Sequence, residues 1–66
     1  MSYPILIGEM AKQKITRELL ADVLNLHRNT VAYKLDKGSF SIEEAEKIHN
    51  KFFEEYPMSE LFKKAE

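Results

Sequence analysis

The sequence predicts an all-α protein, a compact domain of four to five helices, and three observations lead to this fold class. Apolar residues recur at three- and four-residue spacing along most of the chain, as they do in amphipathic helices. No segment alternates apolar and polar residues as a half-buried strand does. Only two Gly and two Pro interrupt the 66 residues, and there is no repeat or low-complexity segment. We therefore expect a single domain over residues 1–66.

The first two helices are predicted over residues 5–13 and 17–24. Leu6 and Met10 are spaced to share one face of the first, although the helix is weakened by a glycine at position 8. Thr16 offers a side-chain oxygen as the N-cap of the second helix. Asn25 is its expected end, because Asn tolerates the left-handed conformation. The apolar stripe of the second helix comprises Leu20, Val23 and Leu24.

A third helix is predicted over residues 28–35, after a turn of about three residues. Val31 and Leu35 are one turn apart and form a thin apolar stripe, while its other residues are polar or small. The segment 36–39 is expected to be a turn, and Phe40 an apolar anchor. Because polar and small residues outnumber apolar ones in this segment, we expect the helix to bury one narrow side and to leave the rest exposed.

The fourth helix is predicted from Ile42 to the vicinity of Pro57, which would end it. Ser41 and Glu44 have the spacing of a capping box at its start. One more short turn is expected after Pro57, capped by Ser59 and folding Leu61 and Phe62 back on the core. The apolar side of the fourth helix is expected to comprise Ile42, Ala45, Ile48, His49, Phe52 and Tyr56.

Composition restricts the function classes. There is no Cys, which excludes disulfides and thiolate metal sites, and the chain has no apolar run of about 18 residues or signal-peptide start. We expect a cytoplasmic protein with no membrane partner. The net charge of -1 hides an asymmetry, since residues 1–42 carry six Lys or Arg against four Asp or Glu and residues 43–66 carry four against seven. The front of the chain is mildly basic and the back acidic.

Two short helices joined by a short turn, the second with a polar outer side, are typical of the helix-turn-helix motif, here at about residues 17–35. Its packing needs a small residue at the crossing, an apolar residue in the turn and one inside the second helix, and Ala21, Leu26 and Val31 occupy these places. Residues 16–35, 41–45 and 52–62 together resemble the phage lambda repressor and Cro-like, or XRE-type, family, and in particular small phage or prophage regulators of Gram-positive hosts.

The sequence departs from that family at three places. Lys14 and Asn25 stand where the family often has Gly, and His27 stands where Ser or Thr usually caps the recognition helix. Asn is a sensible substitute for Gly in a left-handed turn, whereas Lys is a poorer one.

The resemblance implies a lambda-repressor-like fold that binds a double-stranded DNA operator, with the third helix in the major groove. Arg28 is expected to donate to guanine and Asn29 to pair with adenine. The residues expected to contact bases are Arg28, Asn29, Ala32 and Tyr33. The residues expected to contact phosphates are Arg17, His27, Thr30, Lys34, Lys37 and Ser39. A homodimer on a palindromic operator is the expected assembly.

Plainer interpretations of these side chains remain open. Arg28 and Asn29 can be ordinary solvated residues, Tyr33 can lie on the domain surface, and Lys34 and Lys37 can be solvated charges. Phe53 is a candidate dimer contact, because it points about 100° away from its neighbour on a helix, although burial under the tail is the alternative we favour.

Other classes of function find little support. Glu43, Glu44 and Glu46 are best explained by the capping box and a solvated helix side. His27 and His49 are far apart in sequence and lack further ligands, so no metal and no cofactor is expected. We expect no enzyme activity and no small-molecule substrate. The alternative to a DNA-binding regulator is a protein-interaction module, such as an antitoxin or anti-repressor, that uses the same fold.

Overall fold

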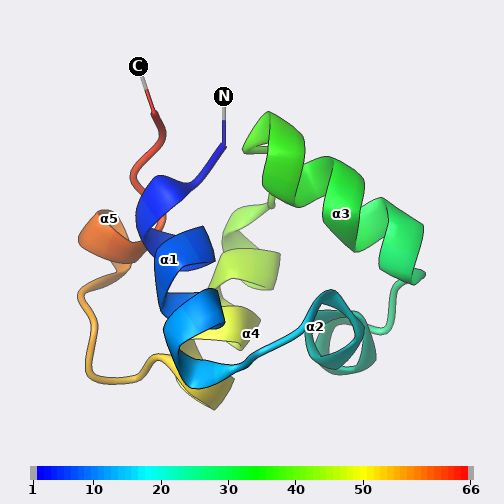
Figure 1. Cartoon of the computed structure of the whole chain (residues 1–66), viewed down its shortest axis with the longest axis horizontal. Coiled ribbons are helices and arrows are strands. Elements are labelled where there is room, and N and C mark those ends of the chain that lie inside the picture. The colour runs from blue at the N-terminus through cyan, green and yellow to red at the C-terminus, as the bar shows by residue number, and fades with distance from the viewer. Residues whose placement is uncertain (1, 66) are drawn as a thin grey trace.

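The computed structural model describes residues 2–65, which form five helices and no β-strand (Figure 1). Their order along the chain is α1 (Pro4–Gln13), α2 (Arg17–Leu24), α3 (Arg28–Lys37), α4 (Ile42–Phe52) and α5 (Met58–Leu61). The predicted all-helical class is therefore confirmed. The chain extends 25 × 24 × 22 Å along its principal axes. None of the helices in residues 2–65 has the length and apolar character needed to cross a membrane.

Left-handed residues end both α1 and α2. Lys14 has φ 58° and ψ 37°, and Asn25 has φ 56° and ψ 45°. Between them, the Thr16 hydroxyl accepts a hydrogen bond from the Leu19 amide at 3.2 Å, as expected of an N-cap. The predicted bounds of α2 are thus confirmed, and its end at Asn25 has the predicted geometry.

The third helix is two residues longer than expected, because it continues to Lys37. Gly38 stops it with φ 67°, and the Ser39 amide donates to the Lys34 carbonyl at 3.0 Å. Glycine reaches this conformation without steric cost, so the helix ends where Gly38 allows the chain to turn.

The fourth helix begins as predicted and ends earlier than predicted. The Ser41 hydroxyl accepts from the Glu44 amide at 3.1 Å, and the Glu44 carboxylate accepts from the Ser41 amide at 2.8 Å, which confirms the capping box. The expected continuation toward Pro57 is wrong, because the backbone leaves the helix at Phe53. Ile42, which was expected on the apolar side of this helix, is 78% exposed at the helix start.

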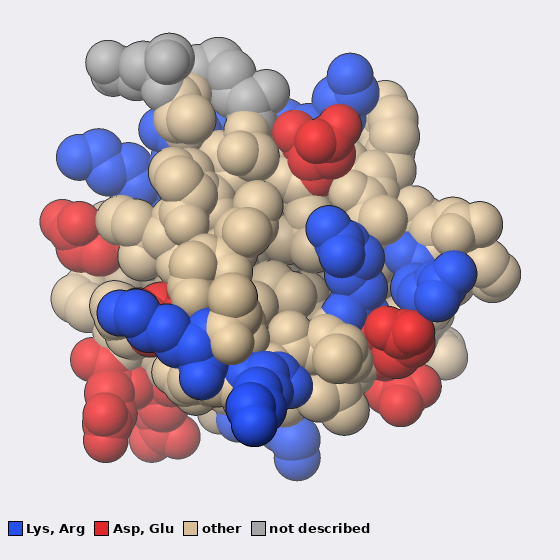
Figure 2. Space-filling model, viewed as in Figure 1, with Lys and Arg blue, Asp and Glu red and all other residues tan. Residues whose placement is uncertain are grey.

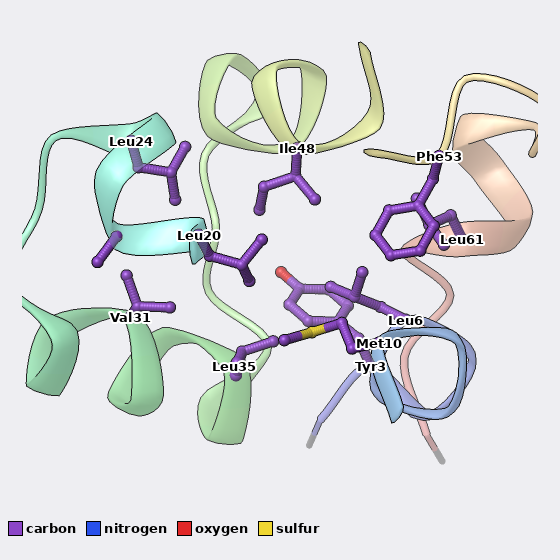
Figure 3. Close-up of a cluster of buried hydrophobic side chains, with 11 residues drawn as sticks. Tyr3, Leu6, Met10, Leu20, Leu24, Val31, Leu35, Ile48, Phe53 and Leu61 are labelled. Atoms are coloured by element: carbon purple, nitrogen blue, oxygen red, sulfur yellow. The ribbon is translucent and has the colours of Figure 1, made fainter. Parts of the chain in front are cut away.

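The early end of α4 decides where Phe53 lies. Its side chain is 2% exposed, so the expectation of a surface dimer contact at Phe53 is wrong and burial is confirmed. The 100° offset assumed a continuing helix, whereas the turn at Phe53 (φ -134°) directs the ring inward beside Leu61 (Figure 3). Ser59 does not cap α5, which begins at Met58 with no side-chain cap, but Leu61 is buried as expected.

A single apolar core joins the helices, as Figure 3 shows for its main side chains. Leu24 of α2 and Val31 of α3 lie on the same side of the core, and Ile48 points from α4 toward Leu20. Ala21 is also buried, and Leu26 packs half-buried against this cluster. The buried members of the cluster are Tyr3, Leu6, Met10, Leu20, Ala21, Leu24, Val31, Leu35, Ile48, Phe53 and Leu61.

Candidate nucleic-acid interface

The α2–α3 pair presents one side of α3 to solvent. Only residues 25–27 connect the two helices, and α2 packs against both α3 and α4. In Figure 1, α2 is seen nearly end-on while α3 runs across the view, so the two helices cross steeply. Val31 and Leu35 are buried on the inner side of α3, which leaves its opposite side free of other elements.

The four residues expected to contact bases lie in the first two turns of α3, where Asn29 and Tyr33 point away from the core and Arg28, seven residues before Leu35, projects at the start of the helix. Arg28 and Ala32 are four residues apart, as are Asn29 and Tyr33, so each pair stacks along the helix. Arg28 and Asn29 are exposed, Ala32 is half-buried, and Tyr33 is 62% exposed. An aromatic ring this exposed, beside a guanidinium and an amide, makes a surface rich in hydrogen-bond donors and stacking area. We call these four residues the α3 outer face.

Arg28 is not an isolated cation. Its Nη1 donates to Glu18 Oε2 at 3.2 Å, and both side chains are about 60% exposed. The hydrogen bond from its own backbone amide, followed by that from Arg28, lowers the pKa of Glu18 below its ordinary value. No local pattern signals this contact, because Arg28 and Glu18 are ten positions apart on different helices. The remaining N–H donors of the guanidinium stay available to a ligand.

Most of the residues expected to contact phosphates are exposed. Arg17, His27 and Thr30 lie near the start of α2 or α3, whereas Lys37 and Ser39 lie at the far end of α3. A helix of ten residues is about 15 Å long, so these groups bracket the α3 outer face.

Lys34 is the exception, because its ammonium is held between α3 and α4. Its Nζ donates to both oxygens of Glu44, at 2.9 and 2.8 Å, and the two side chains are only 26% and 19% exposed. Burial raises the pKa of Glu44, but hydrogen bonds from Lys34 and the Ser41 amide outweigh it, so this pKa lies below 4.5. A phosphate contact by Lys34 would therefore have to break an intramolecular ion pair.

His27 caps α3 with its ring. Its Nδ1 accepts from the Asn29 amide at 3.1 Å, which satisfies one of the free amides of the first turn. A neutral ring whose Nδ1 accepts carries its proton on Nε2, so the exposed side of His27 offers a hydrogen-bond donor. The residue that departs from the usual Ser or Thr thus performs the same capping role.

Charge is unevenly distributed over the surface (Figure 2). Acidic side chains gather at the lower left, where the loop between α4 and α5 lies, whereas basic and acidic side chains alternate over α2 and α3. Among residues 2–65, no three His, Asp or Glu side chains come close enough to hold a metal ion. Comparisons of this chain with protein-family models, curated proteins and solved structures find no match.

Proposed function

We propose that this protein is a sequence-specific double-stranded DNA-binding regulator of the phage or prophage type, with α2 and α3 as its helix-turn-helix. The single observation that carries the proposal is the α3 outer face, in which Arg28, Asn29 and Tyr33 project from a helix whose other side is anchored in the core. The major groove is wide enough to admit such a helix. Regulation would follow from occupying an operator, with no chemical step.

The arrangement assigns different tasks to different side chains. Arg28 can donate two parallel hydrogen bonds to guanine, and Asn29 can pair with the edge of adenine, while Ala32 can contact a thymine methyl group. Exposed donors at the start of α2 and at the end of α3, Arg17 and Lys37, suit phosphates beside the groove. Since one domain of this size contacts few base pairs, a dimer on a palindromic site would supply specificity.

The first experiment identifies and then dissects the site. A random duplex pool is enriched for binders, and affinity for the selected duplex is measured by fluorescence anisotropy at several salt concentrations. Arg28→Ala is expected to weaken binding by about 1–3 kcal/mol and to flatten base preference at one position. Lys51→Ala is the control, because Lys51 is exposed near the end of α4, away from α3. Enrichment of no duplex, or equal losses in both variants, would refute the proposal.

Glu18 provides a second test. Its carboxylate pairs with Arg28 and would lie close to the phosphates of a duplex bound at the α3 outer face. Glu18→Gln removes that negative charge and frees the guanidinium, so we expect tighter binding and a salt dependence steeper by about one released counterion. Glu55→Gln is the matched control, because Glu55 is exposed in the loop between α4 and α5. Equal effects of the two variants would mean that DNA docks elsewhere.

A protein-interaction module, such as an antitoxin or anti-repressor, is the second candidate. The observation in its favour is that both Arg28 and Lys34 are paired with carboxylates, in a chain of net charge -1. The local positive charge available to phosphates is therefore small. Retention of a stoichiometric protein partner by the purified chain, without retention of any duplex, would favour this function over DNA binding.

A further inference from the structure

Two ion pairs connect different helices in residues 2–65, and they differ in what they contribute. Lys34 and Glu44 are 26% and 19% exposed, and Glu44 also completes the capping box of α4, so this pair belongs to the fold. Arg28 and Glu18 are 60% and 62% exposed. An ion pair this exposed adds little to stability, because water already solvates both charges. The pair of Arg28 and Glu18 is therefore better explained by what it presents to a ligand.

This pair places hydrogen-bond donors directly beside an acceptor. Glu18 accepts from one N–H of Arg28 Nη1, so the guanidinium keeps the second N–H of Nη1 and both N–H groups of Nη2. The carboxylate has about four lone-pair sites, of which Arg28 and the backbone amide of Glu18 itself occupy at most two. Because the contact also restricts the guanidinium, its free donors are oriented before a ligand arrives.

The edge of a G·C pair in the major groove has the complementary pattern. Guanine presents two acceptors, N7 and O6, and its cytosine presents the N4 donor next to them. An A·T pair presents an acceptor, a donor and an acceptor in the same places. There, the second donor of a guanidinium and a carboxylate beside it would each meet a group of the wrong kind. Two donors followed by an acceptor, as in Arg28 and Glu18, therefore fit G·C and oppose A·T.

We propose that Glu18 reads a base, by accepting a hydrogen bond from N4 of the cytosine whose guanine is bound by Arg28. This inference rests on the proposed DNA-binding function and adds to it a specificity-determining residue from α2. Nη1 and Oε2 lie 3.2 Å apart, and guanine O6 and cytosine N4, which are hydrogen-bonded to each other, lie about 2.9 Å apart. With this spacing, Nη1 can reach O6 while Oε2 reaches N4 of the same base pair.

The charges around the pair favour a carboxylate at this place. The hydrogen bond from its own backbone amide, the one from Arg28, and the nearby charges of Arg28 and Arg17 all lower the pKa of Glu18. Glu18 therefore stays ionised and only accepts hydrogen bonds. Asp22 is also exposed, one turn further along α2, but makes no ion pair within residues 2–65. Two cations thus flank Glu18 and offset its repulsion from the DNA phosphates.

Modified cytosines test the proposal directly. In the duplex selected by the unmodified chain, the pair read by Arg28 is the position at which Arg28→Ala loses base preference. Replacing the cytosine there with N4-methylcytosine keeps base pairing and removes the N4 donor that faces the major groove. The dissociation constant of the unmodified chain, measured by fluorescence anisotropy, should rise about tenfold, because a hydrogen bond to a carboxylate is lost. 5-Methylcytosine is the control for the bulk of a methyl group and should change it much less.

Two alanine variants assign the effect to Glu18. In Glu18→Ala, the ratio of the dissociation constants for N4-methylcytosine and cytosine should fall from about ten to about one. Asp22→Ala is the matched control, because it removes an exposed carboxylate from the same helix, and it should keep the ratio of the unmodified chain. Removing a negative charge also strengthens binding to every duplex, but this general effect cancels in the ratio.

The outcomes separate this inference from the proposed function. A chain that binds no duplex overturns both. A chain that binds a selected duplex, but with equal affinity for cytosine and N4-methylcytosine, overturns only the reading of cytosine by Glu18. An unchanged ratio in Glu18→Ala, equal losses with the two methylated bases, or the absence of a G·C pair at the position read by Arg28 would overturn it as well.

Discussion

Lys14 occupies the left-handed region at the end of α1, and replacing it with Gly should stabilise the protein. Its side chain is exposed and, within residues 2–65, makes no ion pair or hydrogen bond, so the substitution removes little except the Cβ. The left-handed conformation costs a residue with a Cβ about 1–2 kcal/mol. Glycine also gives the unfolded chain more conformational entropy, which lowers the free energy of unfolding by about 0.4–1 kcal/mol. The expected net gain is about 0.5–1 kcal/mol.

A thermal melt followed by circular dichroism measures this gain. For a domain of this size, about 1 kcal/mol moves the midpoint by roughly 4–8 °C, so Lys14→Gly should raise it by about 3–6 °C. Lys14→Ala is the control, because it removes the charge and keeps the Cβ, and its midpoint should not change. Asn25→Gly should give a smaller rise, since Asn tolerates the same conformation. If Lys14→Gly and Lys14→Ala behave alike, strain at this junction is not the cause.

Three further substitutions test other contacts. His27→Ala should cost about 1 kcal/mol in urea denaturation and His27→Asn much less, because Asn can also cap α3; equal losses would show that the ring does not act as a cap. Glu44 has a lowered pKa in the folded chain, so it binds fewer protons there than in the unfolded chain. Its contribution to stability is complete above about pH 4.5 and is lost as the pH falls below that value, and Glu44→Gln should flatten this part of the stability-versus-pH profile. Phe53→Leu should cost about 1–2 kcal/mol without changing self-association, and a change in association alone would contradict its burial.

Much of the fold could be predicted because it depends on local chemistry. Thr16, Ser41 and Asn25 mark helix ends by hydrogen bonds or backbone conformation that involve only near neighbours, and all three do so in the structure. The end of α4 could not be predicted in this way. Helical spacing continues to Tyr56, but Phe53 is buried in a core that also contains Leu6 and Met10, and this long-range packing takes precedence over the local pattern.

In the candidate site, too, some features follow from the local residue pattern and others depend on how the helices pack. The exposure of Asn29 and Tyr33 follows from the thin apolar stripe of α3, so periodicity was sufficient to predict it. Arg28 is in line with that stripe and is exposed because it is the first residue of the helix. The partners Glu18 and Glu44 lie on other helices, ten residues from the cations that they bind, and no periodic signal connects them. Side-chain pairing across helices depends on how the helices pack, which the residue pattern does not specify.

The carboxylate of Glu44 holds two helices at once. One of its oxygens accepts from the Ser41 amide at the start of α4, and both accept from Lys34 in the last turns of α3. The end of α3 and the beginning of α4 are therefore hydrogen-bonded to the same carboxylate, so the two helices should change orientation together. Ile42 is the first residue of α4 and lies between Ser41 and Glu44, so a displacement of Ile42 reaches α3 through the hydrogen bonds of Glu44. A contact that moves the start of α4 would therefore also change the orientation of α3, and with it the direction in which the α3 outer face points.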